Sequence, residues 1–163
     1  KERLQQLIPS VGFRKNPLKA VIPNGTLIVM HVRRGDLMKP KLIGIGYTFP
    51  EMSYFPNAIN YFNKKYSNLH VVVCCDSLEW CRTHLTSKSA KLYFTNNTDP
   101  IYDLAIMSMS EHMIMTTGTF GWWGAWLANG TTVYYSEWPK KNSILAKGYK
   151  KEDYFPSHWI PMK

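Results

Sequence analysis

The sequence contains few cysteines and no long hydrophobic run. Its 163 residues include three cysteines, Cys74, Cys75 and Cys81, which lie too close together for a disulfide framework. If Cys74 and Cys75 belong to a strand, their side chains point to opposite faces, which disfavours a metal site shared by the two. The favoured interpretation is that the cysteines are small buried hydrophobic residues. No apolar stretch approaches the roughly 20 residues that a transmembrane helix needs.

Several motifs that define common enzyme classes are also missing. The sequence has no G-x-G-x-x-G and no G-x-x-x-x-G-K-[ST], which argues against ordinary dinucleotide binding and P-loop phosphoryl transfer. It has no Asp-x-Asp pair to hold a divalent metal against a diphosphate, and no His/Asp/Glu cluster with metal-ligand spacing. Nothing resembles a Ser-His-Asp set or a nucleophile elbow.

Acidic residues are scarce relative to basic ones: 11 Asp and Glu against 20 Lys and Arg give a formal net charge of +9. This charge admits three kinds of anionic partner: a nucleic acid, a membrane surface or a phosphorylated small molecule. The basic residues are scattered, however, whereas a nucleic-acid-binding stripe would be clustered. Hydrophobic residues make up 45% of the chain, so a packed core is expected and disorder is excluded.

Strand and helix patterns alternate along the chain. Expected strands cover 27–32, 70–75, 91–94, 113–117 and 131–136, and expected helices cover 53–66, 76–85, 99–110 and 119–128. Asp76 and Asp99 are the expected helix caps, and Asn129-Gly130 is an expected helix stop. This alternation predicts an α/β fold, a doubly wound and mainly parallel sheet. Residues 137–163 are expected to pack over its outside.

Polar residues follow the expected strands where such folds bind ligands. Glycine and threonine at a helix start suit a phosphate, and an arginine pair can clamp its oxygens. A diphosphate site is therefore expected at this edge, although a plain tight turn and a surface ion pair between Arg33 and Asp36 remain alternatives. The residues gathered there are His31, Arg33, Arg34, Asp36, Asp76, Asp99, Asp103, Gly118, Thr119 and Phe120.

Other residues have both structural and functional interpretations. His31 fits a core histidine, and Asp103 fits the first turn of its helix. Trp122, Trp123 and Trp126 resemble a sugar-stacking platform, but burial against the sheet is the favoured interpretation. Residues 34–36 also spell the Arg-Gly-Asp adhesion tripeptide, an interpretation that requires an exposed loop tip.

Four segments resemble the galactoside alpha-1,2-fucosyltransferases, glycosyltransferase family 11. They are HVRRGD at 31–36, VVVCCDSLEWCRTHL at 71–85, DLA at 103–105 and IMTTGTFGWW at 114–123, in family order, and the resemblance extends over about residues 27–160. It implies the Rossmann-like, donor-binding C-terminal half of a GT-B enzyme. The implied domains are a connection at 1–26, a GDP-fucose-binding domain at 27–136 and a tail at 137–163.

The resemblance also implies an activity: inverting, metal-independent transfer of L-fucose from GDP-fucose to the 2-hydroxyl of a terminal β-galactoside, without a cofactor. By this resemblance Arg33 holds the β-phosphate with support from Arg34, and His31 and Asp103 contact guanine. Asp76 and Gly118 are further expected donor contacts, and Thr119 and Phe120 hold phosphate through the helix start.

The general base is not defined by the motifs. Asp36 and Glu51 are the candidates, because both are carboxylates near the expected ligand edge, and family members often carry an acid in the loop that holds Glu51. The alpha-1,6 relatives carry a Glu ten residues after the motif histidine, but this sequence has Lys41 there, so that assignment does not transfer. A weak base, or none, is the remaining alternative. Family members are about twice as long. A nucleotide-sugar-binding module without transferase activity is therefore the alternative to an enzyme, and an adhesion ligand is a third.

The family resemblance further implies the lumenal side of the Golgi membrane, reached through an anchor that this sequence does not contain. Candidate N-glycosylation sites are consistent with that compartment. They are Asn24, Asn96 and Asn129, each in an Asn-x-Thr triplet.

Overall fold

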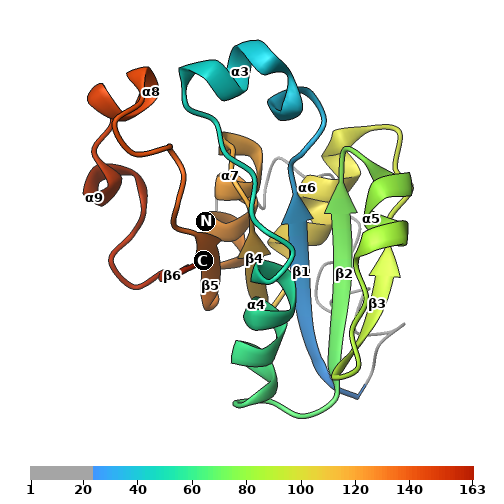
Figure 1. Ribbon diagram of the computed structural model, residues 1–163. Helices are drawn as coiled ribbons and strands as arrows, with labels where there is room; N and C mark the ends of the chain where they lie inside the picture. Colours follow the sequence, from blue (N-terminus) through green and yellow to red (C-terminus); the bar gives the residue numbers. More distant parts are fainter. Residues whose placement is uncertain (1–23) are drawn as a thin grey trace.

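The computed structural model describes residues 24–163. Six parallel strands form one sheet in the order β3-β2-β1-β4-β5-β6 (Figure 1). This is the Rossmann order, and the strand order reverses between β1 and β4. The strands are β1 (Thr26–Val32), β2 (Leu69–Cys75), β3 (Ala90–Phe94), β4 (His112–Met115), β5 (Thr132–Tyr135) and β6 (Ile160–Met162).

Helices cover both faces of the sheet, so the predicted doubly wound α/β fold is confirmed. The elements α4 and α5 share one face, where the rings of Phe55 and Trp80 lie 6.2 Å apart. On the other face α7 packs against α6, and a Cβ on Gly124 would lie 2.5 Å from the sulfur of Met107. The helices are α3 (Pro40–Ile45), α4 (Tyr54–Asn63), α5 (Leu78–His84), α6 (Pro100–Ser108), α7 (Thr119–Ala128), α8 (Ile144–Lys147) and α9 (Lys151–Tyr154), with a 3-10 turn η1 (Asp36–Met38).

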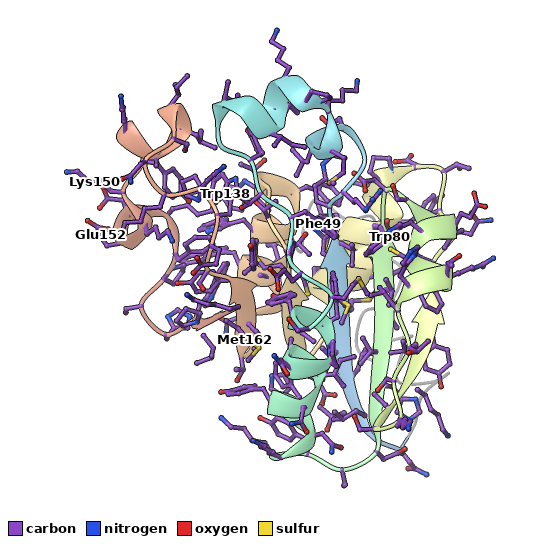
Figure 2. The ribbon with its side chains drawn as sticks, viewed as in Figure 1. Phe49, Trp80, Trp138, Lys150, Glu152 and Met162 are labelled. Carbon is purple, nitrogen blue, oxygen red and sulfur yellow. The ribbon has the colours of Figure 1, made fainter. Side chains whose placement is uncertain are left out.

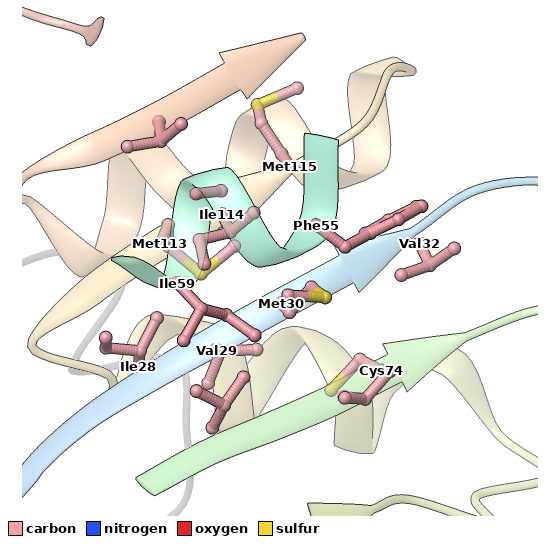
Figure 3. Packing of buried hydrophobic residues seen from close by; sticks show 14 of the residues in the cluster. Ile28, Val29, Met30, Val32, Phe55, Ile59, Cys74, Met113, Ile114 and Met115 are labelled. Atoms are coloured by element: carbon pink, nitrogen blue, oxygen red, sulfur yellow. The ribbon is translucent and has the colours of Figure 1, made fainter. Parts of the chain in front are cut away.

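The core centres on β1, which is buried on both faces from its second residue onward. Such strands consist of nearly continuous apolar residues, because parallel sheets are covered on both sides. Figure 3 shows Phe55 and Ile59 of α4 lying over this strand near Met30. Because successive side chains alternate, His31 points to the opposite face from Met30, toward α7.

The predicted helix ends are partly confirmed. The Asp99 carboxylate accepts a hydrogen bond from the backbone N–H of Ile101 at 2.9 Å and caps α6. Asn129 ends α7 in the left-handed conformation, with φ of 57°. The prediction that Asp76 caps α5 is wrong: Ser77 occupies the N-cap position, without a side-chain capping bond, and the Asp76 carboxylate faces the end of β1 instead.

Residues after β5 contribute more than an outer covering. They form α8, α9 and β6, and β6 pairs in parallel with β5 at the edge of the sheet. Phe155 and Trp159 are buried in the common core. A three-residue strand with a central proline has almost no sequence signal, and Pro161 is tolerated because β6 is an edge strand.

The predicted burial of the tryptophans on α7 is wrong for two of the three. Trp123 is 53% exposed and Trp126 is 50% exposed, and the ring of Trp126 stacks on Trp122 at 5.4 Å. Trp122 is half-buried, and its indole N–H donates to the carbonyl of Tyr154 at 2.7 Å. The small residues Gly121, Gly124 and Ala125 form the buried face of this helix instead.

Candidate functional site

A cavity of about 810 Å³ lies at the carboxyl ends of the strands, where a ligand site was predicted. It extends across the point between β1 and β4 where the strand order reverses. The structure brings together eight of the predicted site residues in its wall: His31, Arg33, Asp36, Asp76, Asp103, Gly118, Thr119 and Phe120. Arg34 and Glu51 do not line it.

Arg33 follows β1 and is anchored at its backbone and its guanidinium. Its backbone N–H donates a hydrogen bond at 2.9 Å to the hydroxyl of Thr116, the residue that follows β4. The guanidinium forms ion pairs with the carboxylates of Asp36, at 2.5 Å, and of Asp76. The side chain is 36% exposed, so one permanently charged group faces the cavity from its centre.

Asp76 connects the ends of β1 and β2. Besides pairing with Arg33, its carboxylate accepts the backbone N–H groups of Arg34 at 2.9 Å and of Gly35 at 3.1 Å. A Cβ on Gly35 would lie 2.9 Å from Asp76 Oδ2, so glycine permits this close approach. Asp76 therefore fixes the turn after β1 as well as the direction of the Arg33 side chain.

Arg34 points away from the cavity. Its guanidinium lies 4.7 Å from the ring centre of Trp80 and 5.7 Å from that of Phe49. These two residues are labelled in Figure 2. Within the residues that the structure describes, the Arg34 Nε is buried without a hydrogen-bond partner. The expectation that Arg34 contacts the donor is not supported by this geometry, because cation–π contacts of this type hold it in the protein wall.

The start of α7 lies beside Arg33. Gly118 precedes this helix with φ of 96°, and a Cβ there would be 3.7 Å from the Cγ of Arg33. The backbone N–H groups of the first helical turn have no partners within the helix. Together with the helix dipole they favour an anion at this point, next to the guanidinium.

His31 is buried beneath the same turn and is 5% exposed. Burial lowers the pKa of His31 to about 4, despite the nearby carboxylates of Asp76 and Asp103, so the imidazole is neutral at pH 7. Its Nδ1 has no hydrogen-bond partner in the described part of the chain, and its ring lies 5.5 Å from that of Phe120. A Cβ on Gly121 would be only 2.4 Å from this Nδ1, so glycine at this position lets α7 lie directly on the imidazole.

The two candidate bases occupy different places. Asp36 lines the cavity in its ion pair with Arg33. Glu51 is exposed on the segment before α4 and does not line the cavity. Of the two, only Asp36 has the position that a base acting in this cavity needs.

One wall of the cavity was not predicted. Aromatic side chains from the segment before α4 and from the residues after β5 form it: Tyr47, Trp138, Tyr149 and Tyr154. The sequence shows that the tail is rich in aromatic residues. It contains no signal that relates them to the ends of the strands, because the tail returns to the sheet through loops and very short helices.

The Arg-Gly-Asp triplet at 34–36 is not a free loop tip. Both of its charged side chains are engaged, Arg34 with aromatic rings and Asp36 with Arg33.

The cysteines and the candidate glycosylation sites differ in exposure. Cys74 and Cys81 are buried and Cys75 is half-buried, and all three are free thiols. The candidate glycosylation sites Asn24, Asn96 and Asn129 are exposed.

Within residues 24–163 no three or more His, Cys, Asp or Glu side chains are grouped to hold a metal ion. In the same part of the chain, none of the helices has both the length and the hydrophobicity of a transmembrane span.

Comparison with known proteins identifies the family. The model of glycosyl transferase family 11 matches residues 11–163. Galactoside alpha-(1,2)-fucosyltransferase 2 of Bos taurus is 31% identical over 153 residues, which are 90% of this chain and 44% of the relative. Galactoside alpha-(1,2)-fucosyltransferase 1 of Sus scrofa and galactoside 2-alpha-L-fucosyltransferase Sec1 of Mus musculus are each 32% identical, over 83% of this chain and 38% of the relative.

The chain thus spans less than half the length of these relatives. Its motifs, its Rossmann strand order and the match over almost its whole length agree with one another. The chain belongs to glycosyl transferase family 11.

Proposed function

We propose that this protein transfers L-fucose from GDP-fucose to the 2-hydroxyl of a terminal β-galactoside, and that the cavity binds the donor. Membership in glycosyl transferase family 11 supports the reaction, as do relatives named as galactoside alpha-(1,2)-fucosyltransferases. The observation that carries the proposal is the convergence of Arg33, the glycine turn of Gly118 and the start of α7 on one cavity.

The diphosphate would lie between Arg33 and the start of α7. An arginine matches the oxygens of a phosphate with two parallel N–H groups, and the helix start adds backbone donors. As the bond between fucose and phosphate stretches, negative charge grows on GDP. Donors already in place stabilise this charge without reorganisation. No metal is required for this step in the proposal.

Guanine would lie toward β3, beside His31 and Asp103. A carboxylate can accept hydrogen bonds from both N1–H and the exocyclic amine of guanine. The Asp103 carboxylate is half-buried and already accepts from the Asn97 side chain at 2.6 Å. The neutral His31 lines the same cavity and is the second polar group proposed to contact the base.

Asp36 is the proposed general base. The acceptor hydroxyl attacks the anomeric carbon, its proton passes to the base, and GDP leaves from the opposite face. In the free protein Asp36 is paired with Arg33. A diphosphate bound to Arg33 competes for the same guanidinium, and this competition would release the carboxylate for proton transfer.

By family membership we also propose the Golgi lumen as the site of action. The exposed Asn24, Asn96 and Asn129 would then be accessible to glycosylation.

The test is a transfer assay with GDP-fucose and a β-galactoside acceptor, with the product linkage determined by NMR. We expect an alpha-1,2-linked product, and loss of about a hundredfold or more of the rate in Arg33→Ala. A folded protein that binds GDP-fucose but forms no product with any β-galactoside would support the nucleotide-sugar-binding module instead.

A further inference from the structure

Three side chains after β5 line one end of the cavity and share an unusual property. The polar atoms Trp138 Nε1, Tyr149 Oη and Tyr154 Oη are buried and have no hydrogen-bond partner among residues 24–163. Their rings form one cluster, with centres 4.7 Å apart for Trp138 and Tyr149, 5.1 Å for the two tyrosines, and 5.5 Å for Trp138 and Tyr154. We call these three residues the aromatic wall.

Unpartnered polar groups in a folded interior cost free energy, and most proteins avoid them. Trp138 is 5% exposed, so water does not reach its indole freely. Burial also raises the pKa of Tyr154 to about 12, so its hydroxyl keeps its proton and can donate a hydrogen bond. Three such groups on one wall of one cavity point to a ligand that supplies the missing partners.

The position of the wall identifies which part of a ligand it meets. Asp103 follows β3, on one side of the cavity, and Arg33 with Gly118 occupies its centre at the ends of β1 and β4. The aromatic wall follows β5, on the opposite side, as the labelled Trp138 shows in Figure 2. A nucleoside diphosphate that has its base near Asp103 and its phosphates at Arg33 therefore extends its remaining group toward this wall.

We propose that the aromatic wall is the sugar subsite of the donor, where it contacts the hexose of the nucleotide sugar. This inference rests on the proposed function. Aromatic rings pack against the apolar C–H face of a sugar, while the indole N–H and the two hydroxyls bond its hydroxyl groups. Leu145 also lines the cavity and adds apolar surface that suits the methyl group of a 6-deoxy sugar.

The test measures the binding of GDP and of GDP-fucose separately, by calorimetric titration of the full chain. The variants Tyr149→Phe and Tyr154→Phe remove one hydroxyl each and keep the ring contacts. We expect the affinity for GDP-fucose to fall about three- to tenfold in each, with the affinity for GDP unchanged. Thermal stability should stay the same or rise, because the removed hydroxyl is unpartnered in the free protein.

Tyr134→Phe is the matched control. Tyr134 stacks on Phe155 at 3.9 Å in the neighbouring aromatic cluster but does not line the cavity, so both affinities should be unchanged. Wild-type-like affinity of both wall variants for GDP-fucose would overturn the inference, and so would an equal loss for GDP and GDP-fucose. Loss of affinity for a β-galactoside alone would assign the wall to the acceptor and overturn it too.

Failure of the proposed function has a different signature. In that case the wild-type chain binds neither GDP nor GDP-fucose, and the inference fails with it.

Discussion

The carboxylate of Asp76 holds the guanidinium of Arg33, and this ion pair joins the carboxyl ends of β1 and β2. The same carboxylate binds two backbone N–H groups of the turn that follows β1. The direction of the cavity's central charge is therefore set by a neighbouring strand. Asp76 acts as a positioning residue in addition to lining the cavity.

Removing Asp76 should weaken nucleotide binding through Arg33. We expect Asp76→Ala to lower the affinity for GDP about tenfold, because the guanidinium and the turn both lose their acceptor. Asp76→Asn keeps an oxygen that can accept from the backbone N–H groups, so its affinity for GDP should fall less than that of Asp76→Ala. Calorimetry checks the affinities, and thermal unfolding shows whether each variant is folded. Unchanged affinity in Asp76→Ala would contradict the positioning role.

The two candidate bases can be separated by a matched pair of variants. Asp36→Asn should lower the rate of transfer at least tenfold, because general-base catalysis typically contributes about a hundredfold or more. Glu51→Gln should leave the rate unchanged, because Glu51 lies outside the cavity. The measurement is kcat for both variants at saturating donor. The reverse order of effects would transfer the role of base to Glu51.

Burial of His31 makes stability dependent on pH. The folded protein holds this pKa near 4, below the ordinary value of 6.5, so the unfolded chain binds the proton more tightly. Stability is therefore full above pH 6.5 and falls as the pH decreases toward 4. Between pH 7.5 and 5 the loss of unfolding free energy from this group is about 2 kcal/mol.

Denaturant unfolding at several pH values checks this, with His31→Asn as reference. The variant lacks the titrating imidazole. The difference in unfolding free energy between wild type and variant should therefore change by about 2 kcal/mol between pH 7.5 and 5. A difference independent of pH would show that His31 keeps its ordinary pKa in the folded protein.

Gly121 should be intolerant of a side chain. A methyl group there would meet His31 Nδ1 at 2.4 Å, so α7 must shift away from the imidazole and the cavity edge must move with it. We expect Gly121→Ala to lower the unfolding free energy by about 1–3 kcal/mol. Gly44→Ala is the control, because its added methyl group would meet no atom within 4 Å and should be neutral or slightly stabilising. Equal stability of the two variants would contradict this packing.

Residues that end a strand were placed correctly from the sequence. The run at 27–32 has a strong strand pattern, and parallel strands bring their carboxyl ends to one edge. His31, Arg33 and Gly118 could therefore be assigned to a common site before the fold was known. The position of Asp103 follows from the same rule, with the cap at Asp99 fixing the start of its helix.

Features that depend on tertiary contacts could not be predicted. Asp76 has the sequence pattern of a helix cap, but its carboxylate instead meets Arg33 and the turn after β1. Arg34 has the sequence position of a phosphate ligand, but Trp80 offers its guanidinium an aromatic face. The wall that includes Trp138 and Tyr149 was missed because the tail approaches the cavity through irregular backbone, for which residue periodicity gives no position.

The most direct test of donor binding is calorimetric titration of the chain with GDP and GDP-fucose, in the presence and absence of EDTA. We predict micromolar binding that EDTA does not change and that Arg33→Ala abolishes, in a variant whose thermal unfolding shows it to be folded. Binding that EDTA removes would contradict the metal-independent donor site. Binding that Arg33→Ala leaves intact would contradict the assignment of the diphosphate to the cavity beside Arg33 and the start of α7.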